Sequence, residues 1–159
     1  YNGIQNYDKA LEFYNKSMEI VLESNNEQEM AILYNNIGYV YKNILKYQEA
    51  GEFYIKALGL FTNVNDKFNM TACYYNLAEL FSILKDYEVA IEYIEKCIKI
   101  DKELDLPILK KDMEFRDLLQ RRQNKASGKS GSTTNELDED EDKLEDPKKK
   151  RGWRLWGKK

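Results

Sequence analysis

The sequence predicts an all-α fold of antiparallel helix pairs, and two observations support this prediction. Apolar residues recur at helical spacing in residues 34–60 and again, forty positions later, in residues 74–100. Small residues recur in the same register at six positions, which are Gly38 and Ala78, Ala50 and Ala90, and Ala57 and Cys97. Because two helices approach within about 8–10 Å only where the side chains at their crossing are short, these positions are expected in the contacts between paired helices.

The first element is expected to be a single helix. The aromatic and small residues of residues 7–18 match those of residues 47–58, one period later. Residues 1–25 are therefore expected to form the second helix of a repeat whose first helix lies outside this sequence. One unit of such a repeat cannot bury its apolar face alone, and about three are needed for stability, so the chain is expected to be a fragment.

Two complete helix pairs are expected next, in residues 26–65 and 66–104. Each is preceded by residues that tolerate turn geometry and cap a following helix, and these are Asn25 with Asn26 and Asn65 with Asp66. The first helices of the pairs are expected over about residues 27–44 and 67–84. Short turns at Leu45 and Lys46, and at Lys85 and Asp86, return the chain in the antiparallel direction.

A terminal capping helix is expected within residues 105–123. The turn before it contains Pro107, a residue suited to the first position of a helix. Glu114, Asp117 and Leu118 stand one period after the apolar residues of the preceding first helix, so the apolar stripe is interrupted there. A helix that is apolar on one face and charged on the other is what the end of a repeat array requires.

The recurring residues resemble the tetratricopeptide repeat family. In that family the first helix carries an aromatic residue, then Leu and Gly, then an aromatic residue, and the second helix alternates aromatic residues with Ala. The matching residues are Tyr34, Ile37, Gly38 and Tyr41 with Tyr47, Ala50, Tyr54 and Ala57, and then Tyr74, Leu77, Ala78 and Phe81 with Tyr87, Ala90, Ile94 and Cys97. The usual period is about 34 residues. The forty-residue period is similar to that of a subgroup with extended helices, which includes the spindle-orientation adaptors. The resemblance covers about residues 1–106 and implies a right-handed α-α superhelix.

The resemblance also implies a function, which is protein-protein interaction as a scaffold or adaptor. The concave wall of such a superhelix is lined by first helices and binds a peptide or a helical segment of a partner. The residues on that side are Asn35, Asn36, Tyr39, Lys42, Asn43, Tyr75, Asn76, Glu79, Ser82 and Ile83. Asn36 and Asn76 hold equivalent positions, where amides either bond a peptide backbone or are simply tolerated. Tyr75 and Glu79 stand where a clamp for a chaperone carboxylate tail needs polar or basic groups, which disfavours that ligand.

The sequence offers little catalytic chemistry. It contains no histidine, which is the commonest general base and metal ligand. Cys73 and Cys97 have neither metal-ligand nor disulfide spacing and are expected to be small buried apolar residues. The string GKS at residues 128–130 lacks the first glycine of a phosphate loop, because Gln123 stands there. We therefore expect no enzymatic activity, cofactor, metal or small-molecule substrate in this segment.

The composition changes near residue 124. Residues 124–135 have the composition of a flexible linker, and residues 136–159 that of a disordered tail, first acidic and then basic. The tail residues suited to an anionic membrane or a nucleic acid are Lys148, Lys149, Lys150, Arg151, Trp153 and Trp156. An adaptor that works through this tail is the alternative function, and an acidic-basic latch or a solvated terminus is also compatible. No run of about 20 apolar residues occurs. Unpaired cysteines favour a cytoplasmic location, and a nuclear one is the alternative, because the basic residues of the tail also suit a nuclear import signal.

Overall fold

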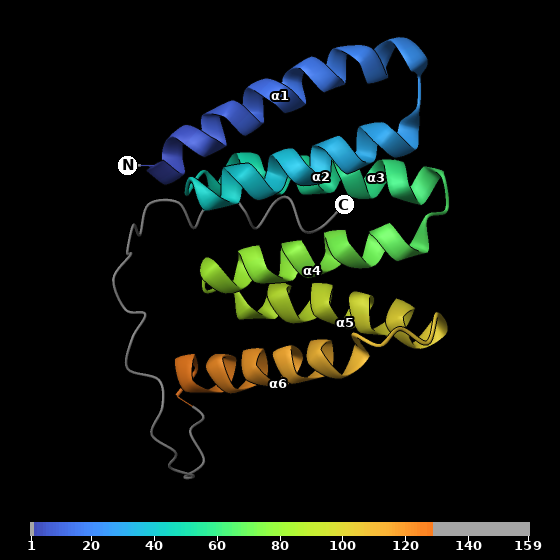
Figure 1. Cartoon of the computed structure of the whole chain (residues 1–159). Coiled ribbons are helices and arrows are strands. Elements are labelled where there is room, and N and C mark those ends of the chain that lie inside the picture. Colours follow the sequence, from blue (N-terminus) through green and yellow to red (C-terminus); the bar gives the residue numbers. More distant parts are fainter. Residues whose placement is uncertain (1, 129–159) are drawn as a thin grey trace.

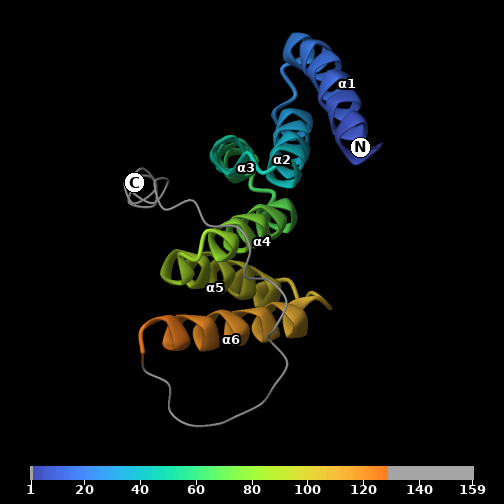
Figure 2. The ribbon, with the colours of Figure 1, turned by 90° about the vertical axis from the view of Figure 1, so that its left-hand side faces the viewer.

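The computed structural model describes residues 2–128, which form six stacked helices (Figure 1). They are α1 (Asn2–Ser24), α2 (Glu27–Asn43), α3 (Tyr47–Asn63), α4 (Lys67–Ile83), α5 (Tyr87–Glu103) and α6 (Leu109–Ala126). Successive helices run antiparallel, with α2 and α4 on one side of the stack and α3 and α5 on the other (Figure 2). The described residues form an all-α solenoid, as predicted. The tail residues named above, and most of the predicted linker, lie outside the described residues.

The small residues lie where the helices of a pair meet. All six of the repeated small positions are buried. A Cβ atom built on Gly38 would stand 2.8 Å from two ring carbons of Tyr54 and 3.2 Å from the carbonyl oxygen of Ala50. The ring of Tyr54 is itself fully buried. The α2–α3 contact is therefore close enough that a side chain at residue 38 has no space.

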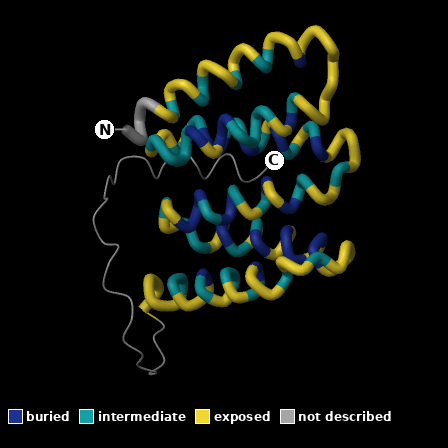
Figure 3. The backbone as a smooth tube through the Cα atoms, viewed as in Figure 1, coloured by how far each residue is buried: buried dark blue, intermediate teal, exposed yellow. Residues whose placement is uncertain are grey.

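The core has two parts. The larger one joins α3, α4, α5 and α6 and includes Tyr54, Leu77, Ile94 and Leu119. The smaller one lies between α2, α3 and α4 and includes Phe61 and three small residues, which are Ala31, Ala57 and Cys73. Buried positions are concentrated in the middle of the stack, whereas α1 is exposed along most of its length (Figure 3).

An aromatic stack is repeated in both helix pairs. In the first pair Phe53 stacks on Tyr41 with 5.3 Å between ring centroids, and in the second Tyr93 stacks on Phe81 at 5.6 Å. The Lys56 ammonium lies 5.1 Å from the centroid of the Phe53 ring, and Lys96 lies 5.1 Å from that of Tyr93. The sequence analysis named Tyr41 and Phe81 but did not single out their partners. The forty-residue repeat thus also includes one aromatic position, Phe53 and Tyr93, and one lysine position, Lys56 and Lys96. Each lysine covers an apolar ring while its charge stays near water.

A turn residue with positive φ occurs every twenty positions, which is twice in each forty-residue repeat. Five residues with positive φ, spaced twenty positions apart, are Asn25, Leu45, Asn65, Lys85 and Asp105. Four of the turns are closed by a hydrogen bond from the following backbone N–H to the carbonyl five residues earlier, as from Lys46 to Tyr41 at 2.9 Å. This is the left-handed ending of an α-helix. The caps predicted at two helix starts are confirmed, because Asn26 accepts from the Glu29 N–H and Asp66 from the Asn69 N–H.

The connection before α6 is longer than the one before α4. Residues 104–108 join α5 to α6, whereas residues 64–66 join α3 to α4. Pro107 lies in this connection, two residues before the helix begins, rather than at the first helical position. The two extra residues shift the register, so that Leu119 rather than Asp117 takes the buried position that Leu77 has in α4. The apolar stripe of α6 is therefore displaced relative to the forty-residue period.

Replacing Asp105 with glycine is expected to raise the free energy of unfolding by about 0.5–1 kcal/mol. Asp105 is exposed with φ at 51°, a conformation that costs an L residue energy and that glycine adopts freely. Chemical denaturation followed by circular dichroism measures the change. Asp105→Ala is the control, because it removes the same charge from the end of α5 without relieving the backbone. Equal stabilisation by both variants would assign the effect to charge.

Candidate protein-interaction face

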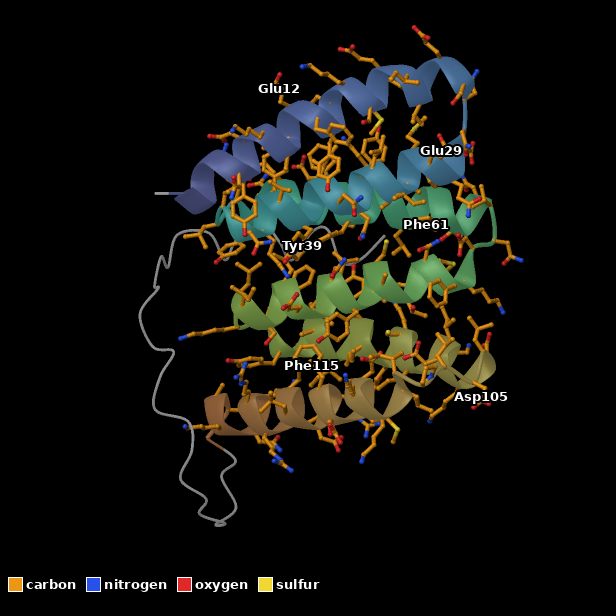
Figure 4. The ribbon with its side chains drawn as sticks, in the orientation of Figure 1. Glu12, Glu29, Tyr39, Phe61, Asp105 and Phe115 are labelled. Carbon is orange, nitrogen blue, oxygen red and sulfur yellow. The ribbon has the colours of Figure 1, made fainter. Side chains whose placement is uncertain are left out.

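The first helices of successive pairs share one side of the solenoid, which we call the first-helix face. We define it by Asn35, Asn36, Tyr39, Lys42 and Asn43 of α2, by Tyr75, Asn76 and Glu79 of α4, and by Phe115 of α6. Residues spaced by three, four and seven positions lie on the same side of a helix, which groups Asn36, Tyr39 and Asn43. The remaining residues are assigned to this face because they contact one another between α2 and α4 or between α4 and α6. Tyr39 lies at the edge of α2 toward α4, and Phe115 on the side of α6 toward the stack (Figure 4).

Polar side chains join α2 to α4 across this face. The Asn76 Nδ2 donates a hydrogen bond of 2.9 Å to the Asn35 Oδ1. Lys42 forms an ion pair with Glu79, and only 10% of the Lys42 side chain is exposed. The Lys42 ammonium also lies 5.0 Å from the centroid of the Tyr39 ring. These four polar residues, predicted as partner contacts, thus connect successive repeats.

Three further residues of the predicted groove differ in their accessibility. Ser82 is buried, so its hydroxyl does not face solvent as the sequence pattern suggested. Asn43 donates from Nδ2 to the carbonyl oxygen of Tyr39 within its own helix, at 2.7 Å. Ile83 is exposed at the end of α4.

Two tyrosines remain open to solvent on the face. Tyr39 is 50% exposed and Tyr75 is 37% exposed. Burial, followed by the nearby charge of Glu79, raises the pKa of the Tyr75 hydroxyl, so this group stays protonated and able to donate at neutral pH. Among residues 2–128 the half-buried Asn36 amide has no hydrogen-bond partner. The face therefore offers aromatic rings together with groups that donate and accept hydrogen bonds.

Phe115 extends the face onto α6. Its ring centroid lies 5.4 Å from that of Tyr75. The sequence analysis did not select Phe115, although it is the only aromatic residue in an otherwise charged helix, and that contrast was a usable signal. The face thus runs over three helices rather than two.

A cavity of about 460 Å³ lies away from this face, between α2 and α3. It is lined by Met30, Tyr34, Ile55, Lys56, Gly59, Leu60 and Asn63. The lining is mostly apolar and holds one charged side chain, so it presents no paired acid and base. Across residues 2–128, none of the helices combines the length and apolar character needed to cross a bilayer.

Comparisons with known proteins agree with this architecture. Residues 29–103 match the family described as tetratricopeptide repeat. No curated protein matches the chain. Among solved structures, the chain is similar to BtubC (BKLC) from P. vanneervenii, with a TM-score of 0.58 and 21% identity over 91% of this chain and 67% of that one. At this identity the likeness supports the fold alone. The matched residues 29–103 contain the helix pairs α2 with α3 and α4 with α5, so the sequence match and the fold agree on a tetratricopeptide-like arrangement in this segment.

Proposed function

We propose that this chain is a protein-interaction module, a scaffold or adaptor, that holds a peptide or helical segment of a partner on the first-helix face. Tetratricopeptide repeats generally bind protein partners. The observation that carries the proposal is the pair of solvent-open tyrosines, Tyr39 and Tyr75, on adjacent first helices. Aromatic side chains that become buried on binding dominate the affinity of most protein interfaces.

The charges of the face favour one kind of partner. Lys42 and Glu79 neutralise each other in their ion pair. The other residues of the face are amides and aromatic residues without charge. A peptide whose apolar side chains are separated by backbone free to form hydrogen bonds suits this surface. A highly charged peptide suits it less well. The Asn36 amide both donates and accepts, so it suits the backbone of an extended peptide.

A peptide selected from a displayed library on the full chain tests the proposal. Tyr39→Ala is expected to weaken its binding at least tenfold, because a truncated aromatic anchor loses about 2 kcal/mol or more. Asn36→Ala is expected to weaken it severalfold. Both variants should keep the melting temperature within a few degrees, since Tyr39 is half exposed. Fluorescence anisotropy measures affinity, and thermal denaturation followed by circular dichroism measures stability.

The matched control lies on the second helices. Glu92→Ala and Glu95→Ala alter exposed residues of α5 and should leave peptide affinity unchanged. Asn76→Ala is a poorer probe, because it also removes the hydrogen bond to Asn35 that joins α2 to α4. Binding that is insensitive to Tyr39→Ala, or that falls equally in the α5 variants, would place the interaction elsewhere.

The repeats also fit the proposed subgroup with a forty-residue period. The starts of α2 and α4, at Glu27 and Lys67, are forty positions apart, and both helices contain 17 residues. This length supports grouping the chain with scaffolds that have extended helices. We also propose a cytoplasmic location for this chain.

A further inference from the structure

Three ionisable side chains meet where α5 packs against α6. Cys97 and Asp101 are four residues apart on one side of α5, and Asp112 stands in the first turn of α6. The Cys97 Sγ lies 3.2 Å from the Asp112 Oδ2 and 3.7 Å from the Asp101 Oδ2. All three side chains offer a ligand atom within 4.8 Å of the others. Asp101 is 0% exposed and Asp112 is 2% exposed, so the cluster is closed to bulk solvent.

The two carboxyl groups have no cationic partner. Within residues 2–128, neither Asp101 nor Asp112 forms an ion pair. The Oδ1 atom of each is buried without a hydrogen-bond partner, in addition to the Oδ2 atoms that face Cys97. Burial of an unpaired carboxylate is costly.

A shared proton satisfies this arrangement only in part. One proton neutralises one carboxyl group and bridges one pair of oxygens, which leaves another buried oxygen without a donor. A divalent cation balances two of the three negative charges of the Asp101 and Asp112 carboxylates and the Cys97 thiolate, and it offers a bond to each of these groups. An ion between the Cys97 Sγ and the two Oδ2 atoms therefore holds all three ligand atoms at once, which a single shared proton does not.

The separations between the Cys97 Sγ and its oxygen neighbours are close to those between sulfur and oxygen ligands of a zinc ion. With zinc bonds of about 2.3 Å to sulfur and about 2.1 Å to oxygen, sulfur and oxygen ligands of one tetrahedron stand about 3.6 Å apart. The two observed separations from the Cys97 Sγ, 3.2 and 3.7 Å, lie on either side of that value. The main-chain oxygen of Thr71 lies 3.5 Å from the same sulfur, at the distance of a fourth ligand. Calcium and magnesium take oxygen ligands, so the sulfur selects a softer ion.

We propose that Cys97, Asp101 and Asp112, with the Thr71 carbonyl, form a structural binding site for a zinc-class divalent cation. The ion links α4, α5 and α6. Asp112 is three residues from Phe115, so binding also fixes the turn of α6 that completes the first-helix face. The inference stands on the buried cluster and is independent of the proposed function.

Cobalt(II) titration of the full chain, reduced and freed of metal by a chelator, tests the site. A cysteine thiolate bound to cobalt gives a charge-transfer absorption in the near ultraviolet. The sequence contains two cysteines and no histidine, so that absorption can arise only from Cys73 or Cys97. We expect it to saturate at one equivalent and to disappear on addition of zinc. The acidic run in residues 136–146 binds cobalt through oxygen alone and gives no such absorption.

Cys73→Ser is the matched control, because Cys73 is equally buried but lies in the other core cluster. It should keep the absorption, whereas Cys97→Ser should lose it and Asp112→Asn should lower the cobalt affinity at least tenfold. Zinc should raise the melting temperature of the wild type and of Cys73→Ser by several degrees, and not that of Cys97→Ser. Circular dichroism verifies that the variants fold.

Two results would overturn the site. One is cobalt absorption that is absent, or that survives in Cys97→Ser. The other is a melting temperature that zinc does not change while Asp112→Asn raises it, which would show that the carboxyl groups share a proton instead.

Discussion

Replacing Gly38 with valine is expected to lower the free energy of unfolding by about 3 kcal/mol. The first added carbon would stand 2.8 Å from the Tyr54 ring and 3.2 Å from the Ala50 carbonyl oxygen, and valine adds two more carbons beyond it. The ring is fully buried and the carbonyl belongs to the α3 backbone, so neither moves without shifting a helix. Overpacking of this kind typically costs about 1–3 kcal/mol, and occasionally more. Urea denaturation followed by circular dichroism measures the loss.

Gly59 provides a matched control in the neighbouring helix. It lies in α3, is exposed, and a Cβ atom built on it meets nothing within 4 Å. Gly59→Val should therefore leave stability unchanged or raise it by a few tenths of a kcal/mol, because valine forms helix better than glycine. If the two variants lose stability equally, valine itself is responsible rather than the crossing of α2 and α3.

Much of the fold could be predicted because the structure of each repeat depends on residues that are close together in the sequence. The chain leaves a helix at the turns of Leu45 and Lys85, and it begins one at the caps Asn26 and Asp66. Each of these features depends on residues within one turn of each other. Alternation of small and large residues then defines which sides of the helices pack. The register of α6 was not predictable in the same way, since two additional residues in the preceding connection break the forty-residue period.

The interaction face was harder to predict than the fold. Asn36 and Asn76 are equivalent by period, yet the partner of Asn76 is Asn35. Two stacked helices face each other with opposite sides, so a side chain of one helix contacts a position of the other that is not its own equivalent. The same reason explains why Lys42 pairs with Glu79, which is not its equivalent in the repeat. Sequence periodicity identifies equivalent positions but not which of them touch.

The buried cluster illustrates a further limit. Cys97 and Asp101 are four residues apart, a common spacing on any helix, and Asp112 follows on the next helix. The sequence analysis expected Cys97 to be a small buried apolar residue, and it is buried, but two carboxyl groups surround its sulfur. Their meeting depends on how the chain turns between α5 and α6. The sequence pattern of α5 or of α6 alone does not indicate how the connection between them turns.

Replacing Leu119 with alanine is expected to lower the free energy of unfolding by about 3 kcal/mol. The side chain is fully buried in the larger core cluster, together with residues of α3, α4 and α5. Truncation removes its apolar contacts and leaves a cavity that the surrounding helices fill only partly, for which about 2–5 kcal/mol is typical. For a domain of this size the melting temperature should fall by about 10 °C.

Gln120→Ala, at the next and exposed position of α6, is the control and should change stability little. The comparison distinguishes two roles for α6. If α6 is an integral first helix of a third repeat, Leu119→Ala lowers the single unfolding transition of the whole solenoid. If α6 docks only as a solvating end, Leu119→Ala melts α6 separately and leaves the transition of α2–α5 near its wild-type position. We expect the first result, because Leu119 packs in the same cluster as Leu77 and Ile94 rather than at its margin.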